Sequence, residues 1–139
     1  MLDEAEFSRW FSMAKRTLDS ALGDLRRGDY NWACFKAQQS AEFALKALHH
    51  GLGLPGYGHS VSRLLQELVE AGLKVKGELM EDAKLLDKLY IPTRYPNAWA
   101  EGCPHDYYTE LDAGRAIEAS RRILEWVEES WSSLSGGDV

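Results

Sequence analysis

The fold is decided by residues 30–48, which read YNWACFKAQQSAEFALKAL. Apolar residues recur in this stretch at intervals of three and four, which places on one face of an α-helix Tyr30, Ala33, Ala37, Ala41, Ala44 and Leu48. Most of these residues are small, so a neighbouring helix can pack closely against the face. Asp29 is expected to cap the start of this helix, and Gly51 is expected to end it.

The same periodicity predicts four further helices. They cover residues 4–25, 61–72, 79–90 and 109–131, the third of these stopped by Pro92 and the last begun by a Thr109–Asp112 capping box. No stretch of β-branched or aromatic residues alternates for long enough to form a strand. The sequence therefore predicts an all-α fold, an up-and-down antiparallel bundle of four main helices plus one short helix.

Length and charge restrict the class of protein. A chain of 139 residues predicts a single domain over 1–139, with its core at about 5–131 and a frayed, polar tail at 132–139. The net charge of −6 argues against strong nonspecific binding of nucleic acid. No run of 18 apolar residues and no signal peptide is seen, so we expect no membrane association and a cytoplasmic protein. Cys34 and Cys103 are expected to be reduced thiols.

The irregular stretch from Ile91 to Tyr108 is the first candidate site. Loops of this length are uncommon in compact domains and are usually functional when they are rich in aromatic residues and proline. Arg94 offers a planar charged group for phosphate, and Tyr95 offers a ring on which a base can stack. Alternatively, the rings of this stretch plug the end of the bundle and Arg94 pairs with a helix C-terminus.

A polar strip on the helix over residues 30–48 is the second candidate site. Gln39, Glu42 and Lys46 are spaced by three and four and therefore share a face, with Gln38 beside them. The alternative is an exposed Glu42–Lys46 ion pair with little energetic effect. His59 precedes the expected capping residue Ser60, where it caps the next helix or lines a cleft.

Cofactor and metal sites are not expected. Residues 51–56 spell G-x-G-x-x-G, but they follow a helix and lack the preceding strand of a dinucleotide-binding site. His49 and His50 are adjacent on a helix, so their side chains diverge by about 100° and cannot readily hold one metal ion. We therefore predict no catalytic residue, no metal and no cofactor.

Three stretches, taken in order, resemble the HEPN domain, the nucleotide-binding domain of higher eukaryotes and prokaryotes. The first is residues 30–48 with their Gln-Gln, Ala-Glu and Lys-Ala pairs. The second is Gly-His-Ser at 58–60 followed by Leu-Leu at 64–65, and the third is Tyr90 with Arg-Tyr-Pro at 94–96. The resemblance covers about residues 5 to 130.

The resemblance implies a helical bundle that binds nucleotides or RNA, forms a homodimer, and acts beside a minimal nucleotidyltransferase, in some relatives as a toxin–antitoxin pair. Ribonuclease members carry an Arg followed, after four to six intervening residues, by His. After Arg94 these positions hold Trp99, Ala100 and Glu101, and His105 comes too late. The resemblance therefore implies a noncatalytic domain.

We thus expect a nucleotide such as ATP to bind at six residues, namely Lys46, Arg94, Tyr95, His59, Glu42 and Gln39. Two alternatives stay open. One is a protein-interaction or dimerisation module without ligand. The other is a ribonuclease with a non-standard site, in which the fold of the loop brings His105 to Arg94.

Overall fold

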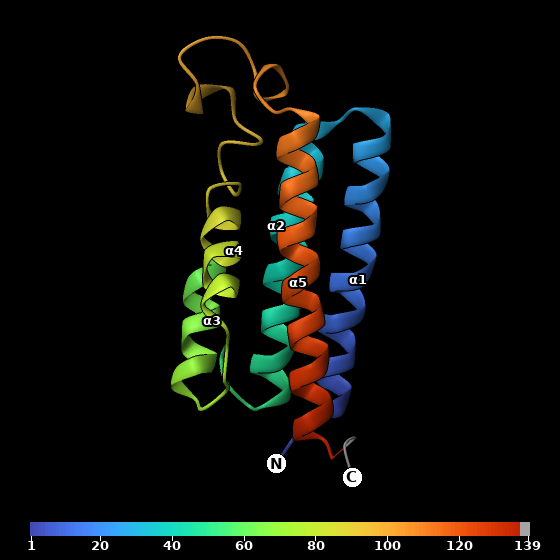
Figure 1. Cartoon of the computed structure of the whole chain (residues 1–139), viewed down its shortest axis with the longest axis vertical. Helices are drawn as coiled ribbons and strands as arrows, with labels where there is room; N and C mark the ends of the chain where they lie inside the picture. Colours follow the sequence, from blue (N-terminus) through green and yellow to red (C-terminus); the bar gives the residue numbers. More distant parts are fainter. Residues whose placement is uncertain (137–139) are drawn as a thin grey trace.

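The computed structural model describes residues 1–136 as one helical bundle, and this region contains no strand. Three long helices form its centre: α1 (Glu4–Arg27), α2 (Tyr30–Gly51) and α5 (Glu110–Leu134). Two shorter helices, α3 (Val61–Glu70) and α4 (Gly77–Asp87), cover the remaining side of α2. Figure 1 shows that α1 and α4 run in one direction and α2 and α5 in the other. The predicted all-α up-and-down bundle is confirmed.

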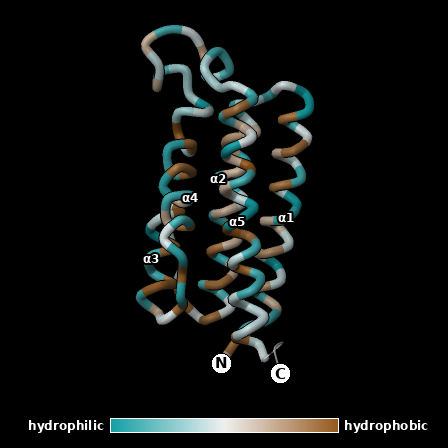
Figure 2. The backbone as a smooth tube through the Cα atoms, in the orientation of Figure 1, coloured by the Kyte–Doolittle hydropathy of each residue, from teal (hydrophilic) through white to brown (hydrophobic). Residues whose placement is uncertain are grey.

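α2 is the central helix of the bundle because it contacts α1, α3, α4 and α5. Its small residues Ala37, Ala41 and Ala44 are completely buried, as the close packing of the neighbouring helices requires. Hydrophobic and hydrophilic positions alternate along each helix, and the connection over residues 91–108 is largely hydrophilic (Figure 2). Because α2 is surrounded on several sides, it also buries polar side chains, and some of these form the site described below.

Local signals set most of the helix ends. The Thr109 hydroxyl accepts the Asp112 N–H while the Asp112 carboxylate accepts the Thr109 N–H, which confirms the predicted capping box. Ser60 caps α3 as expected, by accepting the N–H of Arg63. α3 ends as expected before Gly72, whose φ of 111° lets the N–H of Leu73 bond back into the helix.

Two helix ends differ in part from what was expected. Asp29 occupies the N-cap position of α2 without a capping bond, because its carboxylate lies beside the Arg27 side chain, 3.5 Å from Nε. α4 ends at Asp87, about one turn earlier than expected from its apolar pattern. Pro92 has no N–H to donate to the carbonyl of Lys88, so the α-helical bonding pattern cannot continue there. The N–H of Leu89 bonds to the carbonyl of Leu86, three residues back, and the helix has ended by this point.

The C-terminal part of α5 packs beside the end of α2. The Trp131 ring is half-buried and stacks on Phe7 at 4.3 Å between ring centroids. A β-carbon at Gly51 would lie 2.5 Å from this ring, so only glycine allows the close approach. α5 continues to Leu134, three residues into the segment expected to fray, and residues 137–139 of that segment lie outside the described residues.

No helix among residues 1–136 is both long enough and apolar enough to pass through a lipid bilayer.

Candidate functional site

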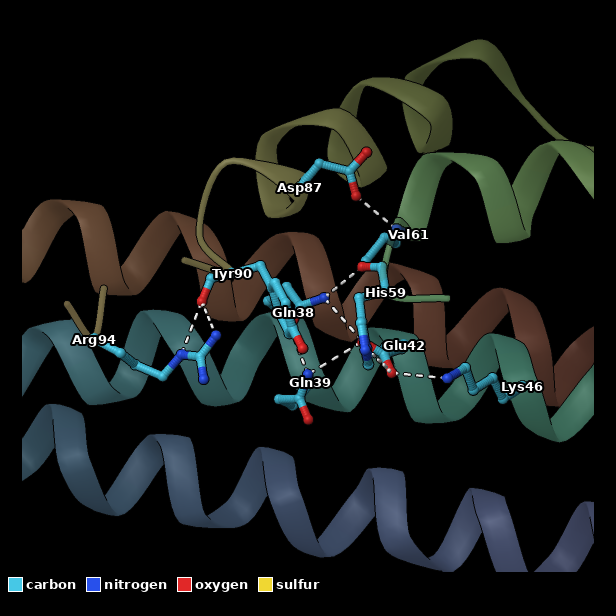
Figure 3. A network of polar contacts seen from close by, with 9 residues as sticks. All are labelled: Gln38, Gln39, Glu42, Lys46, His59, Val61, Asp87, Tyr90 and Arg94. Carbon is cyan, nitrogen blue, oxygen red and sulfur yellow. Dashed lines mark hydrogen bonds and ion pairs between the residues drawn. The ribbon is translucent and has the colours of Figure 1, made fainter. Parts of the chain in front are cut away.

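A buried carboxylate organises the polar strip of α2. Glu42 is 3% exposed and accepts hydrogen bonds from Nε2 of Gln38 and Gln39, each at 3.2 Å. Its other oxygen pairs with Nζ of Lys46 at 3.0 Å, and Nδ1 of His59 lies 3.2 Å away. These five residues form the Glu42 cluster, in which the carboxylate is surrounded by donors (Figure 3).

In the structure, the polar strip of α2 has a different role from the one predicted. The Glu42–Lys46 pair exists, but it is not the exposed pair considered as the alternative, because the segment before α3 and α3 itself cover this face of α2. Lys46 is 12% exposed and its charge is neutralised by Glu42. Lys46 and Glu42 therefore support the neighbouring residues, and neither offers an unpaired charge to a ligand.

His59 is held in place from three sides. Its backbone carbonyl accepts Nε2 of Gln38 at 3.0 Å, its Nδ1 faces Glu42, and its ring stacks on Tyr90 with 4.6 Å between centroids. More than half of the side chain is exposed. Of the two roles considered for His59, capping belongs instead to Ser60, and His59 lines the surface.

The N-terminus of α3 is occupied by a carboxylate from α4. Asp87 accepts the backbone N–H of Val61 at 2.6 Å and that of Ser62 at 3.3 Å, and both Ser60 and Ser62 donate their hydroxyls to it. Helix N-termini attract anions, but here the groups that would hold a phosphate are already used. An anionic ligand must bind elsewhere.

Arg94 is a cation of this surface that is held by a backbone carbonyl and by aromatic rings. Its Nε and Nη2 donate to the carbonyl of Tyr90 at 2.9 and 2.6 Å. Tyr90 lies three residues after the end of α4, so this contact is not the pairing with a helix C-terminus considered as an alternative. Its guanidinium carbon lies 4.2 Å from the Phe35 ring centroid, 4.7 Å from that of Tyr90 and 5.0 Å from that of Tyr95. No carboxylate within residues 1–136 pairs with Arg94, so its charge stays available.

Arg94 and Lys46 lie at opposite ends of the site. Figure 3 shows Arg94 at one end of the row, then Tyr90, then His59 and Glu42, and Lys46 at the other end. Arg94 packs on Phe35, and Phe35 and Lys46 are 11 positions apart on α2, about 16 Å along the axis. The structure therefore brings together Arg94, Tyr95 and His59 with Tyr90, and does not bring the two cations together.

In the connection over residues 91–108, several aromatic rings pack against one another. It contains two short 3₁₀ helices, η1 (Pro96–Ala98) and η2 (Pro104–Asp106). Trp99 stacks on Tyr107 at 4.1 Å and meets the edge of Tyr108 at 5.7 Å. His105 lies 3.5 Å from Asp106, and no bond joins it to Arg94 in the described part of the chain. The ribonuclease alternative gains no support from this geometry.

Two contributors to the site were missed as site residues from the sequence. Phe35 lies one turn before Gln39 on the same face of α2, and Tyr90 lies four residues before Arg94 in the connection after α4. Each of them is therefore four positions away from a residue that was selected as a site residue. This spacing did not reveal that residues 35 and 94 meet, because that contact joins segments far apart in the sequence.

The thiols offer no nucleophile at this site. Burial raises the pKa of Cys34 to about 12, so its thiol stays protonated at neutral pH. Cys103 lies in the connection over residues 91–108 and is not bonded to Cys34. Among residues 1–136, no group of three or more potential metal ligands is assembled.

His49 is a second, completely buried histidine next to the site. It is 1% exposed, and its Nε2 lies 2.9 Å from the carbonyl of Leu64 on α3. Burial lowers the pKa of His49, and the nearby positive charges of His50 and Lys46 lower this pKa further, against the opposing effects of the Leu64 carbonyl and Glu67. The folded protein therefore holds this imidazole in its neutral form at neutral pH.

Lowering the pH from 7.5 to 5.5 is expected to reduce the free energy of unfolding through His49. Because the pKa of His49 is lower in the folded chain than the unfolded value of 6.5, the unfolded chain binds the proton first as the pH falls through 6.5. Urea unfolding at several pH values measures the effect. His49→Gln keeps a donor for Leu64, so this variant should lose less stability over the same range; an equal loss would contradict the assignment.

Proteins of known sequence and structure share this bundle. The HEPN domain family matches residues 7–130. A crystal structure of a protein from Thermus thermophilus is 47% identical, with a TM-score of 0.86, and covers 88% of this chain and 96% of its own. An archaeal HEPN homologue is 39% identical, with a TM-score of 0.76, over 89% of this chain and 96% of its own.

A HEPN domain protein from Thermotoga maritima is 34% identical, with a TM-score of 0.72, over 89% of this chain and 98% of its own. No curated protein matches significantly.

Proposed function

Because this chain belongs to the HEPN domain family, we propose that it is a noncatalytic nucleotide-binding domain whose phosphate site is centred on Arg94. The observation that carries the proposal is the unneutralised guanidinium of Arg94 among the rings of Phe35, Tyr90 and Tyr95. One edge of this guanidinium is bonded to the Tyr90 carbonyl, which orients the group and leaves Nη1 for an acceptor from outside the chain.

The neighbouring residues suit a phosphate. Rings packed on the guanidinium exclude water from its faces, and charge-assisted hydrogen bonds are stronger when water is excluded. His59 supplies a second polar group along the same row, and the Glu42 cluster holds His59 in position. In this proposal Arg94, Tyr95 and His59 contact the ligand, whereas Gln39, Glu42 and Lys46 position His59.

Arg94→Gln is expected to weaken nucleotide binding by about tenfold to a hundredfold, because a charge-assisted hydrogen bond contributes roughly 1.5–3 kcal/mol. Isothermal titration calorimetry with the common nucleoside mono-, di- and triphosphates measures the effect. Arg115→Gln is the matched control, since it removes the same charge from an exposed position on α5. Equal affinities of the Arg94 and Arg115 variants would refute a phosphate site at Arg94.

A second candidate function is supported by exposed apolar residues beside Arg94. Trp32 is 45% exposed and meets the edge of Phe35, whose ring lies against Arg94. Exposed aromatic residues of this kind often lie at protein interfaces. We propose that a second copy of this chain or a minimal nucleotidyltransferase covers this surface, in a cytoplasmic pair of the toxin–antitoxin kind.

Trp32→Ser is expected to weaken that association by at least tenfold, because aromatic residues often contribute most of the binding energy at an interface. Sedimentation velocity of the chain alone, and mixed with a nucleotidyltransferase encoded beside it, measures the association. Trp126→Ser, on α5 near Lys74, is the control. If the wild-type chain stays monomeric and does not bind the nucleotidyltransferase, this function is excluded.

A further inference from the structure

A hydrogen bond from Asn31 joins the start of α2 to the segment that carries Arg94. Asn31 lies in the first turn of α2, is 8% exposed, and donates from Nδ2 to the carbonyl of Thr93 at 3.1 Å. Thr93 is completely buried, and its hydroxyl donates to the carbonyl of Leu89 at 2.8 Å. Arg94 is the next residue, so it extends from a backbone that two side-chain hydrogen bonds hold.

We infer that Asn31 is a positioning residue of the Arg94 site, because its bond to the Thr93 carbonyl sets the place of the guanidinium that a phosphate would contact. The inference rests on the proposed function and extends it to a buried residue that does not touch the ligand. Three observations carry it. They are the hydrogen bonds of one peptide unit, the position of Asn31 on α2, and a second side-chain amide that holds His59 in the same way.

Both polar groups of the peptide unit between Thr93 and Arg94 are hydrogen-bonded. The Thr93 carbonyl accepts Nδ2 of Asn31, and the N–H of Arg94 donates to the carbonyl of Ile91 at 3.1 Å. A peptide unit is planar, so the two bonds fix the plane from which Arg94 extends. Within residues 1–136, Asn31 is the one hydrogen-bond donor to this carbonyl. Loss of the donor would leave a buried carbonyl unpaired, which favours a shift of the segment.

Asn31 and Phe35 hold two different parts of Arg94. They are four positions apart on α2 and therefore lie on the same face of the helix. Asn31 holds the backbone before Arg94, and the Phe35 ring receives the guanidinium, whose carbon lies 4.2 Å from the ring centroid. The aromatic contact alone leaves the guanidinium free to slide across the ring. The bond to the backbone removes that freedom.

The same face of α2 holds His59 in an equivalent way. Gln38 lies two turns after Asn31, is completely buried, and donates Nε2 to the backbone carbonyl of His59 at 3.0 Å (Figure 3). A buried amide of α2 thus bonds to the backbone of His59 itself and another bonds directly before Arg94. Because both amides belong to one helix, they fix the spacing between two residues that are proposed to contact the ligand.

A buried hydrogen bond also stabilises the fold, so the test needs a control residue that has only this effect. Ser40 is a completely buried residue of α2 whose hydroxyl donates to the backbone carbonyl of Ala14 on α1 at 2.7 Å. It lies nine positions after Asn31 and therefore on about the opposite side of α2. Asn31→Ala and Ser40→Ala each remove one buried bond from a side chain to the backbone, but only the first bond lies beside Arg94.

Two measurements separate positioning from stability. The first needs no ligand: the aromatic rings around Arg94 shift its Nε–H signal in NMR spectra, and this shift should decrease in Asn31→Ala and stay unchanged in Ser40→Ala. The second is calorimetry with ATP, GTP, CTP, UTP and pyrophosphate. Circular dichroism checks that each variant is folded. Asn31→Ser, which keeps a shorter donor, replaces Asn31→Ala if that variant does not fold, and it should change both readouts in the same direction.

Asn31→Ala is expected to weaken binding of the tightest of these ligands by about fivefold, the effect of losing one hydrogen bond, and Ser40→Ala should stay within about twofold of the wild type. In an Arg94→Gln background, Asn31→Ala should change the affinity by less than about twofold, because the group that it positions is absent. Equal losses in both backgrounds, or an unchanged Arg94 signal, would overturn the inference, and the proposed function would stand if Arg94→Gln weakens binding. If none of these ligands binds the wild-type chain, the proposed function fails and the inference fails with it.

Discussion

Glu42→Ala is expected to lower the free energy of unfolding by about 3 kcal/mol, because removing one partner of a buried ion pair leaves the other charge uncompensated. Lys46 is 12% exposed and has Glu42 as its carboxylate partner. The same substitution leaves Nε2 of Gln38 and of Gln39 without the acceptor that each now has at 3.2 Å. Urea unfolding followed by circular dichroism measures the loss.

Two comparisons show whether this loss comes from the buried cluster. Glu118→Ala removes a carboxylate that is 48% exposed and pairs with Arg121, and it should change stability by less than about 0.5 kcal/mol. The double variant Glu42→Leu with Lys46→Met removes both charges and should recover part of the lost stability. A cost of Glu42→Ala below about 1 kcal/mol would mean that solvent reaches the cluster and screens it.

Asp87→Ala should lower the free energy of unfolding by about 2 kcal/mol, at the upper end of the range for loss of a helix cap. Asp87 belongs to α4 but accepts the N–H of Val61 at 2.6 Å and of Ser62 at 3.3 Å at the start of α3. Its negative charge also suits the positive end of the α3 dipole. The substitution therefore removes a contact between two helices together with a cap.

Hydrogen exchange distinguishes this role from a general loss of stability. Asp87→Ala should speed exchange of the N–H groups of Val61 and Ser62 more than that of α5, and Asp87→Asn, which keeps one acceptor, should have an intermediate effect. Asp19→Ala on the exposed face of α1 serves as the control. Uniform acceleration throughout the bundle would contradict a local capping role.

The helix ends show which structural features can be predicted from residues that are close in the sequence. The Thr109–Asp112 capping box and the turn at Gly72 depend on residues within a few positions of each other, and both occur where the sequence places them. Asp29 illustrates the limit of such a prediction. It occupies the expected N-cap position, but Arg27 competes for its carboxylate, and sequence spacing does not show which contact forms.

The candidate site was partly accessible from the sequence. Arg94 and Tyr95 were selected because an aromatic, proline-bounded connection of that length is unusual, and the structure places both on one surface with His59 by way of Tyr90. Lys46 was selected from its position on the strip, yet its charge is neutralised by Glu42. A cation is available for a ligand only when no carboxylate of the folded chain reaches it, and that depends on the packing around it.

By itself, the sequence determined the all-α class, the helix order and the small-residue face of α2, because helical periodicity and caps act over three or four positions. Only the tertiary structure decided that Glu42 is buried, that Asp87 caps the neighbouring helix and that Arg94 rests on Phe35. Each of these depends on contacts between distant segments. Burial and charge neutralisation are properties of the packed surroundings, which periodicity along one helix does not contain.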